Sequence, residues 1–198
     1  SRPEHRDADM IETEYGLEKD GYILFLARIV PEKGIHYLIK AYKKLKTDKK
    51  LVIAGGVKQT SEYAEQLKDL AADDDRVMFI GFVQGQMLEE LYSNAYAFVL
   101  PSDVEGMALS LLEAMSYGNC CIVSDIPENT EVVTDHAISF RHGDTDDLNM
   151  KLQDVIDHPE KKERYASASE DYICDRYDWD DVVKRTLCVY GEDHEKND

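Results

Sequence analysis

Two glutamates stand eight positions apart in the stretch SDVEGMALSLLEAMSYG, residues 102–118. Glu105 lies beside a glycine, and Glu113 lies within a leucine-rich run that predicts a helix. The backbone N–H groups of Gly106 to Leu109 would open that helix, and helix starts attract anions. A carboxylate there would repel a neighbouring phosphate and is better suited to sugar hydroxyls. The open alternative is a surface helix with two solvated glutamates.

Two cations lie close together upstream, in the stretch ARIVPEKG at residues 27–34. Arg28 and Lys33 flank a proline after an apolar run that predicts a strand. An arginine can grip two phosphate oxygens and a lysine acts as a mobile point charge, so this pair could clamp a diphosphate. Gly55, which follows the next apolar run, could let a ligand approach the backbone. Equally, the cations could be solvated surface charges and the glycine could only turn the chain.

Composition narrows the classes of function. The formal net charge of −18 over 198 residues repels nucleic acid, so no nucleic-acid partner is expected. The histidines lack metal-ligand spacing, and a chain with 41 acidic residues forms D-x-D pairs by chance, so no metal site is expected either. These pairs include Asp73/Asp75, Asp144/Asp146 and Asp178/Asp180. The four cysteines contain no C-x-x-C pair and fit buried reduced thiols, and no apolar run is long enough to predict a membrane span.

The chemistry-bearing residues must be positioned by elements that alternate along the chain. Short apolar runs predict six strands, at 22–29, 50–56, 76–83, 96–102, 120–125 and 137–144. Helical periodicity predicts helices between them, followed by C-terminal helices with breaks near Pro159 and Trp179. This alternation predicts an α/β fold, with a parallel sheet of about six strands and helices on both faces. Ligands of such sheets bind beyond the carboxyl ends of the strands, where the loops with Arg28, Lys33 and Glu105 fall.

Five motifs together resemble a known family in their order and spacing. They are ARIVPEKG, LVIAGG, FIGFV, PSDVEGMALSLLEAMSYG and VSDIPENTEVV, between about Tyr22 and Phe140. They resemble the C-terminal half of a family 4 retaining glycosyltransferase of the GT-B type, as found in bacterial polysaccharide biosynthesis. The resemblance implies a single Rossmann-like donor-binding domain over 1–198, with an N-terminal linker to about residue 20 and C-terminal helices at about 145–190. It also implies that the N-terminal acceptor domain is absent.

The resemblance further implies roles for individual residues. Arg28 and Lys33 would contact the donor diphosphate, and Glu105 would lie by the transferred sugar, which makes these three the catalytic candidates. Glu113 would hold the ribose hydroxyls. Phe82 and Val83 would frame the base, and the backbone of Gly106, Met107, Ala108 and Leu109 would face sugar and phosphates. Gly55, where a ligand could approach the backbone, is the remaining candidate binding residue. The sequence differs from the family pattern at Ala27 and Cys120. It also differs in SDIPENTE, which replaces a glycine-rich turn.

The expected function is transfer of a sugar from a nucleoside-diphosphate donor, UDP-linked, to a glycan or lipid-linked acceptor. The enzyme would be a hexosyltransferase that needs no cofactor or metal, and this half alone would be inactive. Its expected location is the cytoplasm, with contact at the inner membrane face left to the missing domain. Two alternatives stay open: a nucleotide-binding module that has lost catalysis, and a GT-B-related nucleotide-sugar epimerase. A receiver domain is disfavoured because no lone aspartate follows the first strand.

Overall fold

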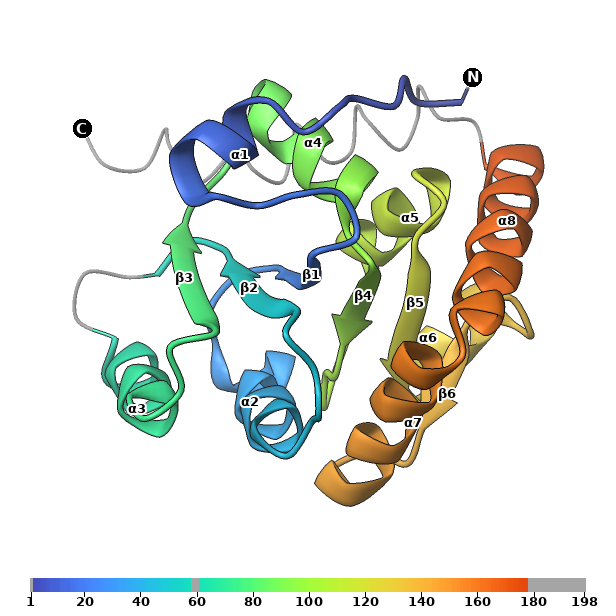
Figure 1. Cartoon of the computed structure of the whole chain (residues 1–198). Helices are drawn as coiled ribbons and strands as arrows, with labels where there is room; N and C mark the ends of the chain where they lie inside the picture. The colour runs from blue at the N-terminus through green and yellow to red at the C-terminus, as the bar shows by residue number, and fades with distance from the viewer. Residues whose placement is uncertain (1, 58–60, 178–198) are drawn as a thin grey trace, which may run out of the picture.

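The computed structural model describes residues 2–57 and 61–177, which build one parallel sheet covered by helices (Figure 1). The strand order is β3-β2-β1-β4-β5-β6, and every neighbouring pair is parallel. The strands are β1 (Tyr22–Leu26), β2 (Lys50–Ala54), β3 (Val77–Gly81), β4 (Ala97–Leu100), β5 (Cys120–Ser124) and β6 (Ile138–Phe140). The predicted six-stranded α/β fold is therefore confirmed, with each strand shorter than the range predicted for it.

Helices cover both faces of this sheet. They are α1 (Met10–Tyr15), α2 (Ile35–Lys43), α3 (Glu62–Ala71), α4 (Gly85–Asn94), α5 (Leu109–Ser116), α6 (Pro127–Val133), α7 (Thr145–Asp157) and α8 (Pro159–Arg176), with a 3-10 turn, η1 (Pro31–Lys33). In Figure 1, α2, α3 and α7 lie on one side, α1, α4 and α5 lie on the other, and α8 packs against both α5 and α7. None of the helices in the described part of the chain is long and apolar enough to cross a membrane.

The C-terminal helices follow the predicted pattern as far as the structure describes them. Helix α7 ends at Asp157 and α8 begins at Pro159, which confirms the predicted break. Proline suits the first turn of a helix because its missing N–H would have no partner there. The second predicted break, near Trp179, lies outside the described residues.

Helix α1 was not predicted, because the first part of the chain carries only a weak apolar pattern. Ile11 is fully buried in the core, and the buried carboxylate of Glu90 accepts hydrogen bonds from the backbone of Asp9 and Ile11, each at 3.1 Å. Burial disfavours the charged form of Glu90, but these bonds and one from Gln86 outweigh it and hold the pKa of Glu90 below its usual value. The partner that orders this helix therefore lies about 80 residues away in the sequence, on α4.

Two of the three cysteines that the structure describes confirm the prediction of buried thiols. Cys120 and Cys121 are fully buried on β5, and burial raises the pKa of Cys120 to about 12. Cys174 is half-buried with a free thiol, and Cys188 lies outside the described residues.

The strand order places a topological switch point between β1 and β4. The chain leaves β1 toward β2 and β3, and then crosses back through α4 to β4 on the other side of β1. Loops that follow two strands wound in opposite directions diverge and leave a crevice at the carboxyl ends. The loops after β1 and β4 are the ones that carry Arg28, Lys33 and Glu105.

Candidate functional site

The loops after β1 and β4 meet backbone to backbone at Gly34. This residue has a φ of +68°, and a Cβ atom placed on it would lie 2.1 Å from the carbonyl oxygen of Pro101. The Asp103 N–H also donates to the carbonyl of Glu32 at 2.8 Å. Only glycine combines this left-handed conformation with so close an approach. Gly34 thus brings the loop with Lys33 against the loop with Glu105.

Lys33 and Glu105 form an ion pair across this junction. The Lys33 ammonium nitrogen lies 2.8 Å from each oxygen of the Glu105 carboxylate. The side chain of Glu105 is 2% exposed and that of Lys33 is 16% exposed, so the pair is largely shielded from water. A buried carboxylate requires such a counter-charge. An ammonium group has three hydrogens, so one remains for a further acceptor.

Arg28 lies in the same loop as Lys33, directly beyond the end of β1. Its side chain is exposed, and it makes no hydrogen bond or ion pair with residues 2–57 or 61–177. The carboxyl edge of the sheet therefore carries an arginine that is available to an anion, in the loop whose lysine holds Glu105.

Glu105 and Glu113 are both buried, each with 6% of the residue exposed. The alternative of two solvated glutamates on a surface helix is therefore wrong. Glu113 lies on α5, and burial raises the pKa of Tyr117, one turn further on, to about 12, with the Glu89 and Glu113 carboxylates adding to the effect. A role for Glu113 toward ribose stays a prediction.

The start of α5 follows directly after Glu105. Helix α5 begins at Leu109 with Ala108 as its N-cap residue, and no side chain caps it. The Leu109 N–H donates to the carbonyl of Met107 at 2.8 Å, so this donor is engaged within the loop. Four backbone N–H groups were predicted to face a ligand. That of Leu109 instead makes a hydrogen bond within the loop, whereas Gly106 and Met107 lie exposed before the helix.

Gly55 has a packing role that the sequence left open. A Cβ atom on Gly55 would lie 1.8 Å from the carbonyl oxygen of Ala27, so the glycine lets the loops after β1 and β2 touch. Gly55 also borders a pocket of about 520 Å³ at the carboxyl ends of β1, β2 and β3. Phe82, which is exposed, and Val83, which is half-buried, follow β3 at the same edge. Gly55 therefore both allows the two loops to pack closely and borders a pocket that a ligand could enter.

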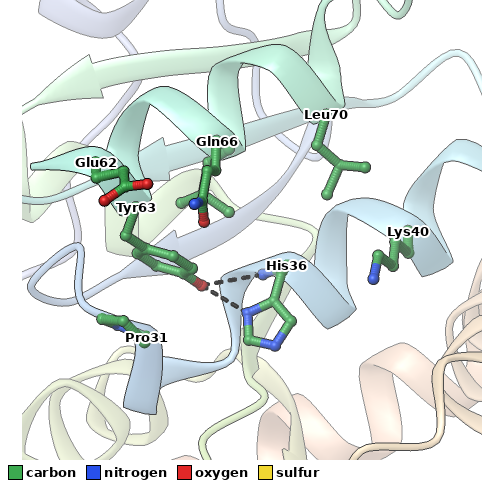
Figure 2. Close-up of a pocket in the computed structure, with 8 residues that line it drawn as sticks. Pro31, His36, Lys40, Glu62, Tyr63, Gln66 and Leu70 are labelled. Atoms are coloured by element: carbon green, nitrogen blue, oxygen red, sulfur yellow. Dashed lines mark hydrogen bonds between the residues drawn. The ribbon is translucent and has the colours of Figure 1, made fainter.

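A larger hollow, of about 720 Å³, lies between α2 and α3 and was not predicted (Figure 2). His36 and Tyr63 point toward each other across it, with 2.7 Å between the His36 Nδ1 atom and the Tyr63 hydroxyl. Burial lowers the pKa of His36 below its usual value, which favours the neutral ring near pH 7. The hollow also borders the oppositely charged Lys40 and Glu62. This balance of charge suits a diphosphate less well than the edge with Arg28 and Lys33.

Three of the four aspartates that the structure describes in the named D-x-D pairs have structural partners, and one of them is Asp146, which pairs with Lys44 at 3.0 Å. The Asp144 carboxylate caps α7 by accepting from the Asp147 N–H at 2.9 Å, and Asp73 pairs with Lys43. Within residues 2–57 and 61–177, no three or more His, Cys, Asp or Glu side chains are grouped to hold a metal ion. Asp178 and Asp180 lie outside the described residues.

Sequence reasoning missed the polar residues that surround Glu105. Ser102, Ser124 and Asn129 are fully buried close behind it. In addition, Asp103 Oδ1 lies 2.6 Å from His142 Nε2, which joins the loop after β4 to the loop after β6. Single serines and asparagines after strands are common turn residues, so their types alone carry no signal.

The chain is similar to known proteins over most of its length. The family described as glycosyl transferases group 1 matches residues 8–172. An uncharacterised glycosyltransferase of Methanocaldococcus jannaschii is 31% identical over 85% of this chain and 44% of its own length. The O-antigen chain mannosyltransferase RfbU of Salmonella typhimurium is 33% identical over 83% of this chain and 45% of its own length. The chain thus spans less than half the length of these curated relatives.

Solved structures share the fold at lower identity. Anabaena HepE, determined in complex with UDP and glucose, superposes with a TM-score of 0.79 at 18% identity, over 92% of this chain and 51% of that one. The C-terminal domain of the group 1 protein LpcC from Francisella tularensis gives a TM-score of 0.76 at 20% identity, over 88% of this chain and 96% of that domain. At these identities the likeness shows the fold alone. From the extent of the family match, this chain belongs to the group 1 glycosyl transferases, with the Rossmann-like sheet of the GT-B type.

Proposed function

We propose that this chain is the donor-binding half of a retaining glycosyltransferase, with a UDP-linked sugar as donor and a glycan or lipid-linked acceptor. The observation that carries the proposal is the Lys33–Glu105 pair at the switch point of the sheet, with the exposed Arg28 in the same loop. At this edge, the two cations suit the diphosphate of a nucleotide sugar, and the carboxylate suits its sugar. Two comparisons support it: HepE was solved with UDP and glucose, and RfbU is named an O-antigen chain mannosyltransferase.

The proposed division of labour follows from charge. Arg28 and the free hydrogen of Lys33 would hold the diphosphate, whose negative charge grows as its bond to the sugar breaks. Glu105, paired with Lys33, would accept hydrogen bonds from sugar hydroxyls. Glu113 would accept from the ribose, and the residues after β3 would frame the base. Because the two cations would carry the charge of the leaving group, we also propose that the reaction requires no metal.

The acceptor half is proposed to lie outside these 198 residues. The chain covers less than half of each curated relative described above, and sugar transfer needs an acceptor held against the donor in a water-poor cleft. The chain alone should then bind a nucleotide but transfer no sugar, and any contact with a membrane would belong to the other half. Robust transfer by the 198-residue chain, measured with a nucleotide sugar and glycan acceptors, would contradict this.

Substitution of Arg28 tests the diphosphate role. A thermal-shift screen of UDP-, GDP- and dTDP-sugars first identifies the base. Arg28→Ala should then weaken binding of the nucleoside diphosphate about 10-fold to 100-fold, because a hydrogen bond to a charged group contributes roughly 1.5–3 kcal/mol. Binding of the nucleoside, which lacks the phosphates, should not change. Isothermal titration calorimetry with UDP and uridine measures both for a uracil donor.

Arg164→Ala provides the matched control, because Arg164 is an exposed arginine on α8, far along the chain from both loops. It should leave both affinities as in the wild type. Equal losses for UDP and uridine in Arg28→Ala, or no loss for either, would show that Arg28 does not bind the diphosphate.

A further inference from the structure

A chain of buried hydrogen bonds runs behind Glu105 and joins the loops after β4 and β5. The Ser102 hydroxyl donates to Glu105 Oε1, and the Ser124 hydroxyl donates to the Ser102 carbonyl at 2.6 Å. The Asn129 side-chain amide, on α6, donates to the hydroxyl and the carbonyl of Ser124 at 3.1 and 3.2 Å. Ser102, Ser124 and Asn129 have no exposed surface. The route therefore runs from α6 to the Glu105 carboxylate without leaving the interior.

The direction of each bond in this chain is fixed by its chemistry. A carboxylate and a carbonyl can only accept hydrogen bonds. Each serine must therefore donate its single hydroxyl hydrogen to the acceptor nearer to Glu105. The amide of Asn129 must present its NH₂ group to Ser124, because the Ser124 carbonyl accepts but cannot donate. These hydrogen bonds therefore have one arrangement of hydrogens, in which the Glu105 oxygens only accept.

Asn129 has a feature that packing alone does not explain. Its side-chain oxygen is buried and has no hydrogen-bond partner among the described residues. Such an orphaned acceptor lowers stability, because it has lost its hydrogen bonds to water and gained none in the protein. The side-chain oxygen of Asn129 thus lowers the stability of the fold. The useful part of the side chain is its NH₂ group, which orients Ser124.

Lys33 alone cannot fix the orientation of Glu105. A lysine reaches its partner through a flexible four-carbon stem, and its ammonium group rotates freely. Ser102, by contrast, has a short side chain, is fully buried, and contacts only one of the two Glu105 oxygens. The serine therefore distinguishes Oε1 from Oε2 and sets the rotation of the carboxylate plane.

We propose that Ser102, Ser124 and Asn129 are positioning residues that hold the Glu105 carboxylate in the orientation that recognises the sugar of the donor. The inference rests on the proposed function, in which Glu105 contacts that sugar. It assigns to these residues a specific effect: they set the gain in affinity that the sugar adds to the nucleoside diphosphate, and they leave the affinity for the nucleoside diphosphate itself unchanged.

The test compares two affinities in each variant of the 198-residue chain. The probes are UDP-glucose, GDP-mannose or dTDP-glucose, whichever stabilises the wild type most, and the matching nucleoside diphosphate. The ratio of the two dissociation constants reports the gain from the sugar. Ser102→Ala should reduce this gain about fivefold to tenfold, since Glu105 loses the contact that sets its rotation but keeps its contact with Lys33. Ser124→Ala, which does not touch Glu105, should reduce it in the same direction but less.

Two further variants separate positioning from packing. Ser102→Cys keeps nearly the same volume but replaces the hydroxyl with a weak donor, so it should lose the gain as Ser102→Ala does. Ser169→Ala removes an equally buried serine on α8, whose hydroxyl bonds to backbone carbonyls such as that of Asn119, and should keep the gain. Retention of the gain in Ser102→Ala or Ser102→Cys would overturn the inference. A wild type without any gain from the sugar would instead overturn the proposed role of Glu105, and the inference with it.

Discussion

Replacement of Gly34 by alanine should lower the free energy of unfolding by roughly 2–5 kcal/mol. The left-handed conformation costs an alanine roughly 1–2 kcal/mol, and forcing an atom into a packed region costs about 1–3 kcal/mol more. The new Cβ atom would meet the carbonyl oxygen of Pro101 at 2.1 Å and the ring of Tyr37 at 2.9 Å. Since the obstacle at Pro101 is backbone, relief requires the loops after β1 and β4 to separate.

Urea denaturation followed by circular dichroism measures this loss. Gly56→Ala is the matched control, because a Cβ atom on Gly56 meets nothing within 4 Å, and its stability should change by no more than about 0.5 kcal/mol. The Gly34→Ala variant should also bind nucleoside diphosphate more weakly, since its loops no longer abut. Equal stability of the two variants would show that the close contact at Gly34 does not hold these loops together.

Replacement of Lys33 by alanine should lower the free energy of unfolding by about 3 kcal/mol, because it leaves the buried Glu105 carboxylate without its counter-charge. The same variant should lose most of its affinity for a nucleoside diphosphate. Removal of Glu105 as well, in Lys33→Ala/Glu105→Ala, should recover part of the stability but none of the affinity, since the unpaired charge is gone but the cation is still missing.

Lys68→Ala provides the comparison for stability. Lys68 pairs with Glu65 at 3.3 Å, but both side chains are more than half exposed, so this pair contributes about 0.2–1 kcal/mol. Urea denaturation at pH 7 gives the stability of all variants. If Lys33→Ala is no less stable than Lys68→Ala, the Lys33–Glu105 pair is not a buried structural contact. Lys33 would then not be the counter-charge that stabilises the buried Glu105 carboxylate.

The sequence predicted the elements that position the site because their signals are local. Apolar runs such as the one at Tyr22–Leu26 predict buried strands, and their alternation with helices predicts a parallel sheet and its carboxyl edge. Arg28, Lys33 and Glu105 were therefore expected at the same edge from chain order alone. The family resemblance then suggested which of them would face which part of a donor, and those roles remain proposals.

Contacts between distant residues were beyond this reasoning. Lys33 and Glu105 are 72 positions apart, and their direct pairing depends on how closely Gly34 approaches Pro101. Helix α1 was missed for the same reason, since its order depends on the distant Glu90 carboxylate. Ser102 was also missed, because a buried hydroxyl that donates to a carboxylate has the same sequence signature as an ordinary turn serine.

A nucleoside diphosphate should bind at the carboxyl edge between the loops after β1 and β4. This binding is tested most directly by NMR chemical-shift mapping of the ¹⁵N-labelled chain titrated with UDP, or with the diphosphate of the base that the thermal-shift screen selects. We expect saturable changes concentrated in the amides of residues 28–34 and 102–109. Changes concentrated instead around His36 and Tyr63, in the hollow between α2 and α3, or the absence of saturable changes, would contradict it.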